Sequence, residues 1–345
     1  MNARVNLHGH NPFTSGEGNM TSRLVSTFAV VGIAVAISPP VHAQSFRMIA
    51  GWDKSNVMAY MPGLQFKTNA EKMSGGKITV DINGPEAVPP FQQMEPASSG
   101  AFDLVYTHPT YHSKGLAGVA EILPFGPDRL RQTGVFGAID GFYQKNHNIK
   151  LLALVSIGSK GYHCYMNKPL TEKGDWSGRK LRGVANQHGV IKALGGVPVV
   201  LAMGDVYSSI EKGVVDGGCA PGFVFEATKH YEVAKYRVEP LFGLLVSLIG
   251  INLDRWNKLP KDQQELLVKI GAQTEIDTAR TGDETLEAQN KRLAERGVQV
   301  TRLSKEKGDL IQEAFTSSNW ELAEKCCGEA GKALQELARK AGLSK

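Results

Sequence analysis

Residues Asp175–Pro221 read DWSGRKLRGVANQHGVIKALGGVPVVLAMGDVYSSIEKGVVDGGCAP. The pattern predicts strand, helix, strand, helix, because extended runs at 180–184 and 197–202 alternate with helical spacing at 189–194 and 206–212. Such alternation is typical of an open α/β sheet, in which ligands collect beyond the carboxyl ends of the strands.

Arg182 lies near the end of the first of these strands. Its guanidinium presents a rigid fork of donors that matches a carboxylate in two parallel hydrogen bonds. The position therefore predicts a small organic anion as ligand. The residues leave a second interpretation open, in which Arg182 pairs inside the protein with a nearby carboxylate such as Asp205 or Asp216.

The same stretch resembles the extracytoplasmic solute-binding proteins of TRAP transporters, the DctP family. The family pattern in this region is GxKxR, followed by LGxxPVxxxxxEVYxxLxxGxVDG. Residues 73–85, 98–113 and 256–260 also fit the family, so the resemblance covers most of the chain. The matching positions of the pattern are Gly178, Lys180, Arg182, Leu194, Gly195, Pro198, Val199, Asp205, Val206, Tyr207, Ile210, Gly213, Val215, Asp216 and Gly217.

The resemblance implies a two-lobed α/β periplasmic binding protein fold of type II-like form. Such a fold has two mixed, mainly parallel sheets with flanking helices, a hinge and a long lobe-spanning helix. The resemblance also implies that Arg182 binds a ligand carboxylate between closing lobes. The closed form would deliver the organic acid to the membrane subunits of a TRAP secondary transporter, without catalysis and without a cofactor.

The rest of the chain continues the alternation of strands and helices. About 300 residues follow the expected signal peptide, which exceeds the size at which a single hydrophobic core usually stops growing. Two lobes are therefore expected, at 44–159 plus 247–286 and at 160–246 plus 287–345. Gly158 and Gly161 would give the first crossing the freedom of a hinge. The expected elements are strands at 46–50, 78–82, 101–106, 151–155 and 245–253, helices at 61–73 and 261–296, and helical core stripes from 310 to 337.

Residues 20–43 have the pattern of a secretory signal peptide. Arg23 supplies the positive charge, an apolar run covers 24–37, and small residues precede the expected cleavage site after Ala43. The run is shorter than the roughly 20 residues of a spanning helix, so we expect a periplasmic protein without direct membrane insertion. Residues 1–19 show no apolar periodicity and are expected to be a misannotated extension.

The charge pattern and the motifs exclude several classes of function. The chain has 39 Lys and Arg against 34 Asp and Glu, with no basic block, so nucleic-acid binding is not supported. The sequence contains no GxSxG, HExxH, GxGxxG or P-loop pattern. His108 and His112 have the spacing of a helical zinc pair, but Pro109 interrupts the helix, so no metal site is expected.

Departures from the family pattern shape the expected ligand. Tyr162 stands where many members carry a second ligand arginine, and it cannot neutralise a second carboxylate. Cys219 and Ala220 stand where many members carry a Glu followed by an Asn or Trp. The loss of the Glu removes an oxygen ligand for a cation that would bridge protein and substrate, and the smaller side chains leave room in the pocket. We therefore expect a monocarboxylate with a bulky, aromatic or branched body. The expected further contacts are Trp52, Tyr111 and Phe223 as apolar walls and His108 and His163 as hydrogen-bonding partners.

Two other classes of function remain open. A secreted enzyme acting on an organic acid would use His108, His163 or Cys164, although no nucleophile, base and orienting group occur at recognisable spacing. A ligand sensor for a membrane histidine kinase or chemoreceptor would use the same fold and cleft.

The four cysteines are Cys164, Cys219, Cys326 and Cys327. Three pairings are open in an oxidising compartment, and the sequence does not choose among them. Because a bridge between adjacent cysteines is strained, we expect Cys326 and Cys327 to be free, partly buried thiols on a helix.

Overall fold

A computed structural model describes residues 43–124, 126–170, 174 and 176–344. The expected extension and the signal peptide up to residue 42 lie outside the described residues. The described chain belongs to one compact unit. None of its described helices combines the length and hydropathy that a bilayer-spanning segment needs.

The first lobe is built on a mixed five-stranded sheet of order β2-β1-β3-β10-β4. β1 pairs in parallel with β2 and β3, whereas β10 is antiparallel to both β3 and β4. In the sequence, β10 follows the strands β5 to β9 of the second lobe. The sheet of the first lobe is therefore completed only after the chain has returned from the second. The strands are β1 Gln44–Ala50, β2 Ile78–Asn83, β3 Leu104–Thr107, β4 Ile149–Ser156 and β10 Val246–Asn252.

The second lobe is built on a mixed six-stranded sheet of order β11-β9-β5-β8-β6-β7. β6 is parallel to β7 and β8, and β9 is parallel to β11, while β5 is antiparallel to β8 and β9. The strand-helix order expected for 175–221 is confirmed as β6, α5, β7, α6 and β8. The elements are β5 Tyr162–Met166, β6 Lys180–Arg182, α5 His188–Ala193, β7 Val197–Val199, α6 Val206–Glu211, β8 Gly217–Ala220, β9 Tyr236–Phe242 and β11 Gln299–Arg302.

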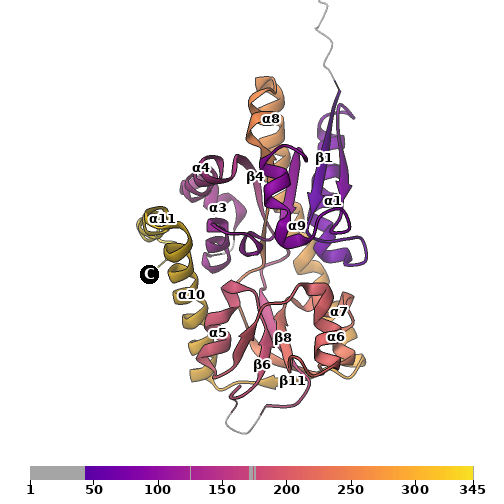
Figure 1. The fold of residues 1–345 in the computed structure, drawn as a ribbon, viewed down its shortest axis with the longest axis vertical. Helices are drawn as coiled ribbons and strands as arrows, with labels where there is room; N and C mark the ends of the chain where they lie inside the picture. The colour runs from indigo at the N-terminus through magenta and orange to yellow at the C-terminus, as the bar shows by residue number, and fades with distance from the viewer. Residues whose placement is uncertain (1–42, 125, 171–173, 175, 345) are drawn as a thin grey trace, which may run out of the picture. The chain divides into compact units, whose positions relative to one another are not determined.

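The long helix α9, Lys261–Glu295, confirms the helix expected at 261–296. It packs on α1 and β4 of the first lobe and on α7 of the second, so it runs along both (Figure 1). Its buried side includes Leu267, Ile270 and Leu293. The other helices up to α8 are α1 Val57–Met73, α2 Met94–Ser98, α3 Pro127–Gln132, α4 Val135–His147, α7 Gly222–Ala227 and α8 Leu253–Asn257. The short 3-10 helices are Pro90–Gln92, Pro109–Tyr111, Leu116–Ile122, Ala185–Gln187, Met203–Asp205 and His230–Glu232.

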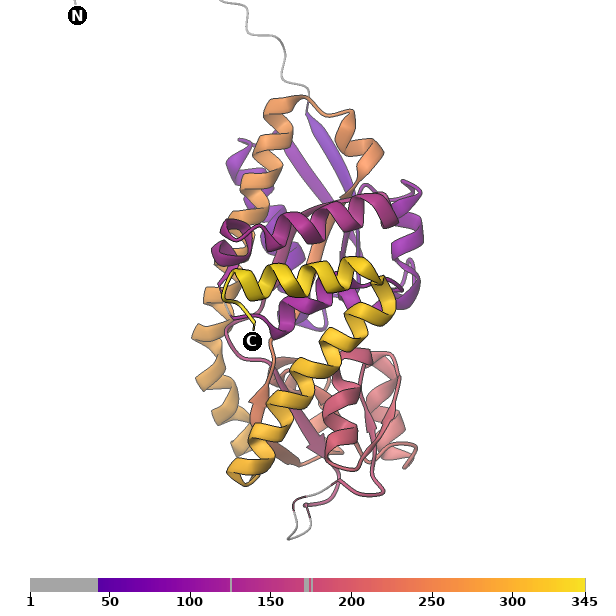
Figure 2. The same cartoon turned by 90° about the vertical axis from the view of Figure 1, so that its left-hand side faces the viewer.

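The carboxyl-terminal helices connect the lobes a second time. α10, Lys305–Cys327, packs on α5 and β9 and also on the 3-10 helix Leu116–Ile122. α11, Glu329–Lys340, lies beside α4, as Figure 2 shows. This last helix falls within the range expected for the second lobe, yet its Leu334 joins the core of the first.

The first crossing between the lobes follows β4. Gly158 has φ +79°, a conformation that favours glycine. Asp283 Oδ1 in α9 accepts hydrogen bonds from the backbone N–H and the hydroxyl of Ser159, at 2.7 and 2.9 Å. The long helix is therefore attached directly to the crossing segment.

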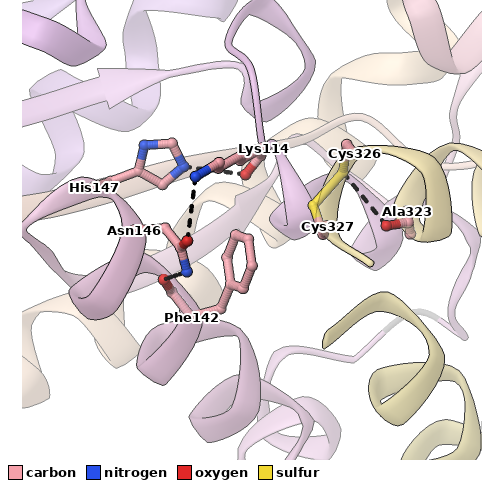
Figure 3. Close-up of a disulfide and its surroundings, with 7 residues drawn as sticks. All are labelled: Lys114, Phe142, Asn146, His147, Ala323, Cys326 and Cys327. Atoms are coloured by element: carbon pink, nitrogen blue, oxygen red, sulfur yellow. Dashed lines mark hydrogen bonds between the residues drawn. A yellow bond between two sulfur atoms is a disulfide. The ribbon is translucent and has the colours of Figure 1, made fainter. Parts of the chain in front are cut away.

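The cysteines form two disulfides. Cys164 joins Cys219 across the neighbouring strands β5 and β8. Cys326 joins Cys327 at the end of α10 (Figure 3), so the expectation of two free thiols is wrong. The adjacent cysteines lie where the helix stops, since Gly328 with φ +57° takes the chain out of the helical path.

Candidate functional site

A cavity lies between the two lobes, beyond the carboxyl ends of parallel strands. Trp52 follows β1 and His108 follows β3 in the first lobe, while Arg182 ends β6 and Ala220 ends β8 in the second. The empty space that its walls enclose, open solvent included, is about 410 Å³. The strand ends of both sheets thus form one site, as expected for open α/β sheets.

The Arg182 guanidinium lies in the wall of this cavity and is held by backbone oxygens. Its Nε donates to the carbonyl of Leu201 at 3.1 Å, and its Nη1 donates to the carbonyl of Cys219 at 3.3 Å. Gly218 makes room for the side chain, because a Cβ there would lie 3.1 Å from the Arg182 Cβ. Nη2 is buried and has no hydrogen-bond partner within the described residues.

The charge of Arg182 is not neutralised by either carboxylate that the sequence suggested. Asp205 is exposed, and the Asp216 carboxylate accepts a hydrogen bond from the backbone of Lys180 at 2.8 Å. Burial lowers the pKa of Arg182, while Tyr111 acts in the opposite direction. Burial likewise raises the pKa of Tyr111, and the Arg182 charge beside it lowers that pKa. A buried cation without an acidic partner provides a place for an anion.

A buried carboxylate, Glu121, lies behind the part of the cavity wall that Tyr162 and His108 form. The Tyr162 hydroxyl donates to Glu121 Oε1 at 2.7 Å, and His108 Nε2 lies 2.8 Å from the same oxygen. Asn186 donates to Glu121 Oε2, and the backbone N–H of Val246 donates to Oε1 at 3.1 Å. The donor that the sequence assigned to the ligand, the Tyr162 hydroxyl, is thus directed at Glu121.

Aromatic rings line part of the cavity. The Trp52 ring centroid lies 5.0 Å from that of Tyr106 and 6.1 Å from that of Tyr111. Trp52, Tyr111 and Met203 also line a neighbouring hollow with about 770 Å³ of empty volume, and Phe91 borders it. The aromatic wall therefore continues from the cavity toward solvent.

The structure brings six of the nine expected contacts to the cavity and places three elsewhere. Cys219 offers its carbonyl to Arg182, but its side chain is in the disulfide. Phe223 and His163 line a separate pocket beside the crossing segment. His163 alternates with Tyr162 on β5, so its side chain leaves the opposite face of the sheet. The six at the cavity are Trp52, His108, Tyr111, Tyr162, Arg182 and Ala220.

Several residues at the site had not been singled out from the sequence. Glu121 could have been found as a single charge in the apolar run LAGVAEIL at 116–123, since such a residue is buried only when partnered. The others carry no local signal, because apolar residues look like ordinary core and isolated Gln or Ser residues belong to no motif. They include Ala59, Tyr106, Gln187, Met203, Val224 and Ser247.

The described residues contain no group of His, Cys, Asp and Glu arranged to hold a metal ion. His112 contacts the Thr107 hydroxyl at 2.9 Å, and burial lowers its pKa to about 3. His108 instead contacts Glu121, so the two histidines do not converge on one point.

The chain matches known proteins along most of its length. The family model DctP, "Bacterial extracellular solute-binding protein, family 7", matches residues 53–325. A solved TRAP periplasmic solute-binding protein from Desulfovibrio salexigens, with bound orotic acid, superposes with a TM-score of 0.74. It is 19% identical and the match covers 86% of this chain and 98% of that one.

Two curated relatives are similar over shorter stretches. The C4-dicarboxylate-binding periplasmic protein DctP of Rhodobacter capsulatus is 34% identical over 110 residues, 31% of this chain and 33% of that protein. The monocarboxylate 2-oxoacid-binding periplasmic protein of Nostoc sp. is 29% identical over 241 residues, 64% of this chain and 63% of that protein. The chain spans less than two thirds of each of these relatives.

Proposed function

The chain belongs to the DctP family of bacterial extracellular solute-binding proteins, family 7, and we propose that it captures a small organic acid and delivers it to a TRAP-type secondary transporter. This is a family of solute-binding proteins and not of enzymes, so the solute leaves chemically unchanged. The proposed place of work is the periplasm, reached through the signal peptide expected at 20–43.

The Arg182 guanidinium is the observation that carries the proposal. Its Nη2 is buried and lacks an acceptor within the described residues, and Arg182 lines the cavity between the lobes. A ligand carboxylate would supply that acceptor and the missing negative charge. The proposed ligand contacts are Arg182 together with Trp52, His108, Tyr111, Tyr162 and Ala220.

We propose that the ligand is a monocarboxylate with a bulky body. Among the described residues that line the cavity, Arg182 is the single Lys or Arg side chain. Tyr162, which stands where many family members carry a second arginine, adds no positive charge. The remaining wall is largely apolar, and the hollow beside Trp52 and Tyr111 offers space for the body of the ligand. The Nostoc relative, whose name states a monocarboxylate ligand, aligns over more of the chain than the dicarboxylate-binding relative does.

Capture is proposed to proceed by closure of the two lobes. The lobes would divide as the sequence suggests, at 44–159 plus 247–286 and at 160–246 plus 287–345, except that α11 packs on the first lobe. Ligand can favour the closed form only through contacts to both lobes. Arg182 supplies the contact in the second lobe, while Trp52 and His108 supply contacts in the first.

A binding screen tests this function. Thermal unfolding of the purified protein is followed with benzoate, 4-methyl-2-oxopentanoate and 2-oxobutanoate, and with succinate and malate as dicarboxylates. We expect stabilisation by at least one monocarboxylate, because a ligand that binds only the native state raises the midpoint. Mass spectrometry of the co-purified small molecules identifies the natural ligand.

Two outcomes would contradict the proposal. Stabilisation by succinate or malate, with none by any monocarboxylate, would overturn the monocarboxylate assignment. The absence of binding by every acid, together with a co-purified ligand without an acid group, would overturn organic-acid capture itself.

A further inference from the structure

Glu121 is a buried acid that the proposed capture of a carboxylate does not by itself explain. Its side chain is fully buried, and it belongs to the 3-10 helix Leu116–Ile122 of the first lobe. Two of its donors, Tyr162 and Asn186, come from the second lobe. An anion is thus buried at the junction of the lobes, within one hydrogen bond of the cavity wall.

His108 does not cancel this charge. The backbone N–H of Thr110 donates to His108 Nδ1 at 3.3 Å, so Nδ1 carries a lone pair and not a proton. The ring proton is then on Nε2, which faces Glu121 at 2.8 Å. The hydrogen-bond network thereby assigns an imidazole with one ring proton, and all four contacts to the Glu121 oxygens come from neutral donors, as a carboxylate requires.

The Tyr162 hydroxyl has no hydrogen-bonding capacity left for a ligand. It donates its proton to Glu121, and it accepts from His108 Nε2 at 3.1 Å and from Asn186 at 3.5 Å. His108 Nε2 is shared between Glu121 and Tyr162. This part of the wall therefore offers a ligand no free donor, and it has a negative charge directly behind it.

We propose that Glu121 is the residue that excludes acids with a second carboxylate, which rests on the proposed capture of organic acids. Arg182 accepts one carboxylate on its side of the cavity. A second carboxylate near Tyr162 would meet a like charge across a buried, low-dielectric wall and would find no donor there. Like-charge contacts of this kind reduce affinity strongly.

Glu121→Gln tests the role with little change of shape. An amide oxygen in place of Oε1 can still accept from Tyr162, His108 and the Val246 N–H, so the substitution removes the charge and keeps these contacts. The NH₂ group then takes the place of Oε2 and faces the Asn186 side chain, whose amide can turn to present its oxygen. The matched control is Asp140→Asn. Asp140 is also a buried acid of the first lobe, it accepts from the backbone N–H of Leu151 at 2.8 Å and pairs with Lys150, and it does not line the cavity.

Calorimetry compares pairs of acids that differ by one carboxylate, 2-oxopentanoate with 2-oxopentanedioate and benzoate with benzene-1,3-dicarboxylate. For wild type and Asp140→Asn we expect the monoacid to bind at least about 100-fold more tightly, and for Glu121→Gln that preference falls by about tenfold or more. If the glutamine variant does not unfold cooperatively, Glu121→Met removes the same charge and is compared instead.

The outcomes separate this inference from the proposed function. If wild type binds both members of a pair equally, or if neither charge-removing variant alters the preference, Glu121 is not the determinant, while organic-acid capture stands. If wild type binds only the dicarboxylates, the inference and the monocarboxylate assignment both fail. If wild type binds no acid of either pair and none in the wider screen, the proposed function fails and the inference with it.

Discussion

Arg182 Nη1 donates to the carbonyl oxygen of Cys219 at 3.3 Å, so the end of β8 orients the guanidinium that ends β6. A second backbone acceptor, the carbonyl of Leu201, holds Nε at 3.1 Å. Both acceptors are neutral, which leaves the charge and the Nη2 donors for a ligand. Substitutions of Arg182 should therefore affect binding far more than folding.

Arg182→Ala is expected to abolish detectable binding of the acid found in the screen. Losing a charge-assisted, bidentate pair in a closed site costs about 1.5–3 kcal/mol or more, and the described residues that line the cavity include no other Lys or Arg. Arg182→Lys should bind at an intermediate level, since it keeps the charge but not the fork. Calorimetry measures both variants.

The unliganded stability provides the control for Arg182→Ala. The substitution loses two hydrogen bonds to carbonyls but also removes a buried, unpaired charge, so the free energy of unfolding should change by less than about 1 kcal/mol. Near-native affinity in the alanine variant would show that Arg182 is not the ligand residue.

The strands and helices were predictable because their signals are local. The runs at 180–184 and 197–202 became β6 and β7, and the helix expected at 261–296 is α9. The sheet order was not predictable in the same way. β10 pairs antiparallel to β3 and β4, and no pattern within β10 itself indicates these partners, which lie roughly 90 to 150 residues earlier in the chain.

The site was predictable chiefly where a residue follows or ends a strand. Trp52, His108 and Arg182 each stand at a strand end, and all three line the cavity. His163 was included beside Tyr162 although neighbours on a strand point to opposite faces. Glu121 was missed because it comes from an irregular turn, and its partners are known only from the tertiary structure.

His163 is expected to influence acid stability and not ligand binding. Burial, followed by the charge of Arg237, lowers its pKa to about 3 from 6.5. The unfolded chain takes up the proton below pH 6.5 and the native protein does not. The stability from neutral His163 is thus present above pH 6.5 and is lost as pH falls toward 3, by at most about 1.4 kcal/mol per pH unit.

His163→Gln tests both parts of this expectation. Between pH 6.5 and pH 4 the variant should lose less free energy of unfolding than wild type, as measured by urea titration at each pH. Its affinity for the acid should stay within about twofold of wild type, because His163 lies in the separate pocket beside the crossing segment. An unchanged pH slope, or a large loss of affinity, would contradict the assignment.

The two disulfides should differ in what they contribute to stability. The Cys164–Cys219 bond closes a loop with a sequence separation of 55, so removing it with Cys164→Ala and Cys219→Ala should cost about 3–4 kcal/mol. The Cys326–Cys327 bond has a separation of 1 and restricts the unfolded chain little, so its double alanine variant should lose roughly 1 kcal/mol or less.

Reduction of the wild-type protein distinguishes the stability that comes from the disulfide bond from the stability that comes from packing of the cysteine side chains. Urea unfolding with dithiothreitol should show most of the loss seen in the Cys164 and Cys219 variant, since reduction breaks the bond and keeps the side chains. Equal stability of the two double variants would mean that loop closure does not explain the difference.

The contact between α9 and the first segment that crosses between the lobes should be disrupted by one methyl group added at Gly282. A Cβ at Gly282 would lie 2.2 Å from the backbone nitrogen of Gly158, and a backbone atom cannot move aside as a side chain tip can. Gly282→Ala should push the helix from the crossing segment and cost about 1–3 kcal/mol. It should also weaken binding of the acid, because the proposed closure of the lobes takes place around this crossing.

Gly137→Ala is the matched control on an exposed part of α4, where an added Cβ meets nothing within 4 Å. There the same change should stabilise the protein by about 0.5–1 kcal/mol, since alanine loses less backbone entropy than glycine in a helix. Urea unfolding and calorimetry on both variants measure stability and affinity together. If Gly282→Ala proves as harmless as Gly137→Ala, the close approach of α9 to the crossing plays no part in either folding or capture.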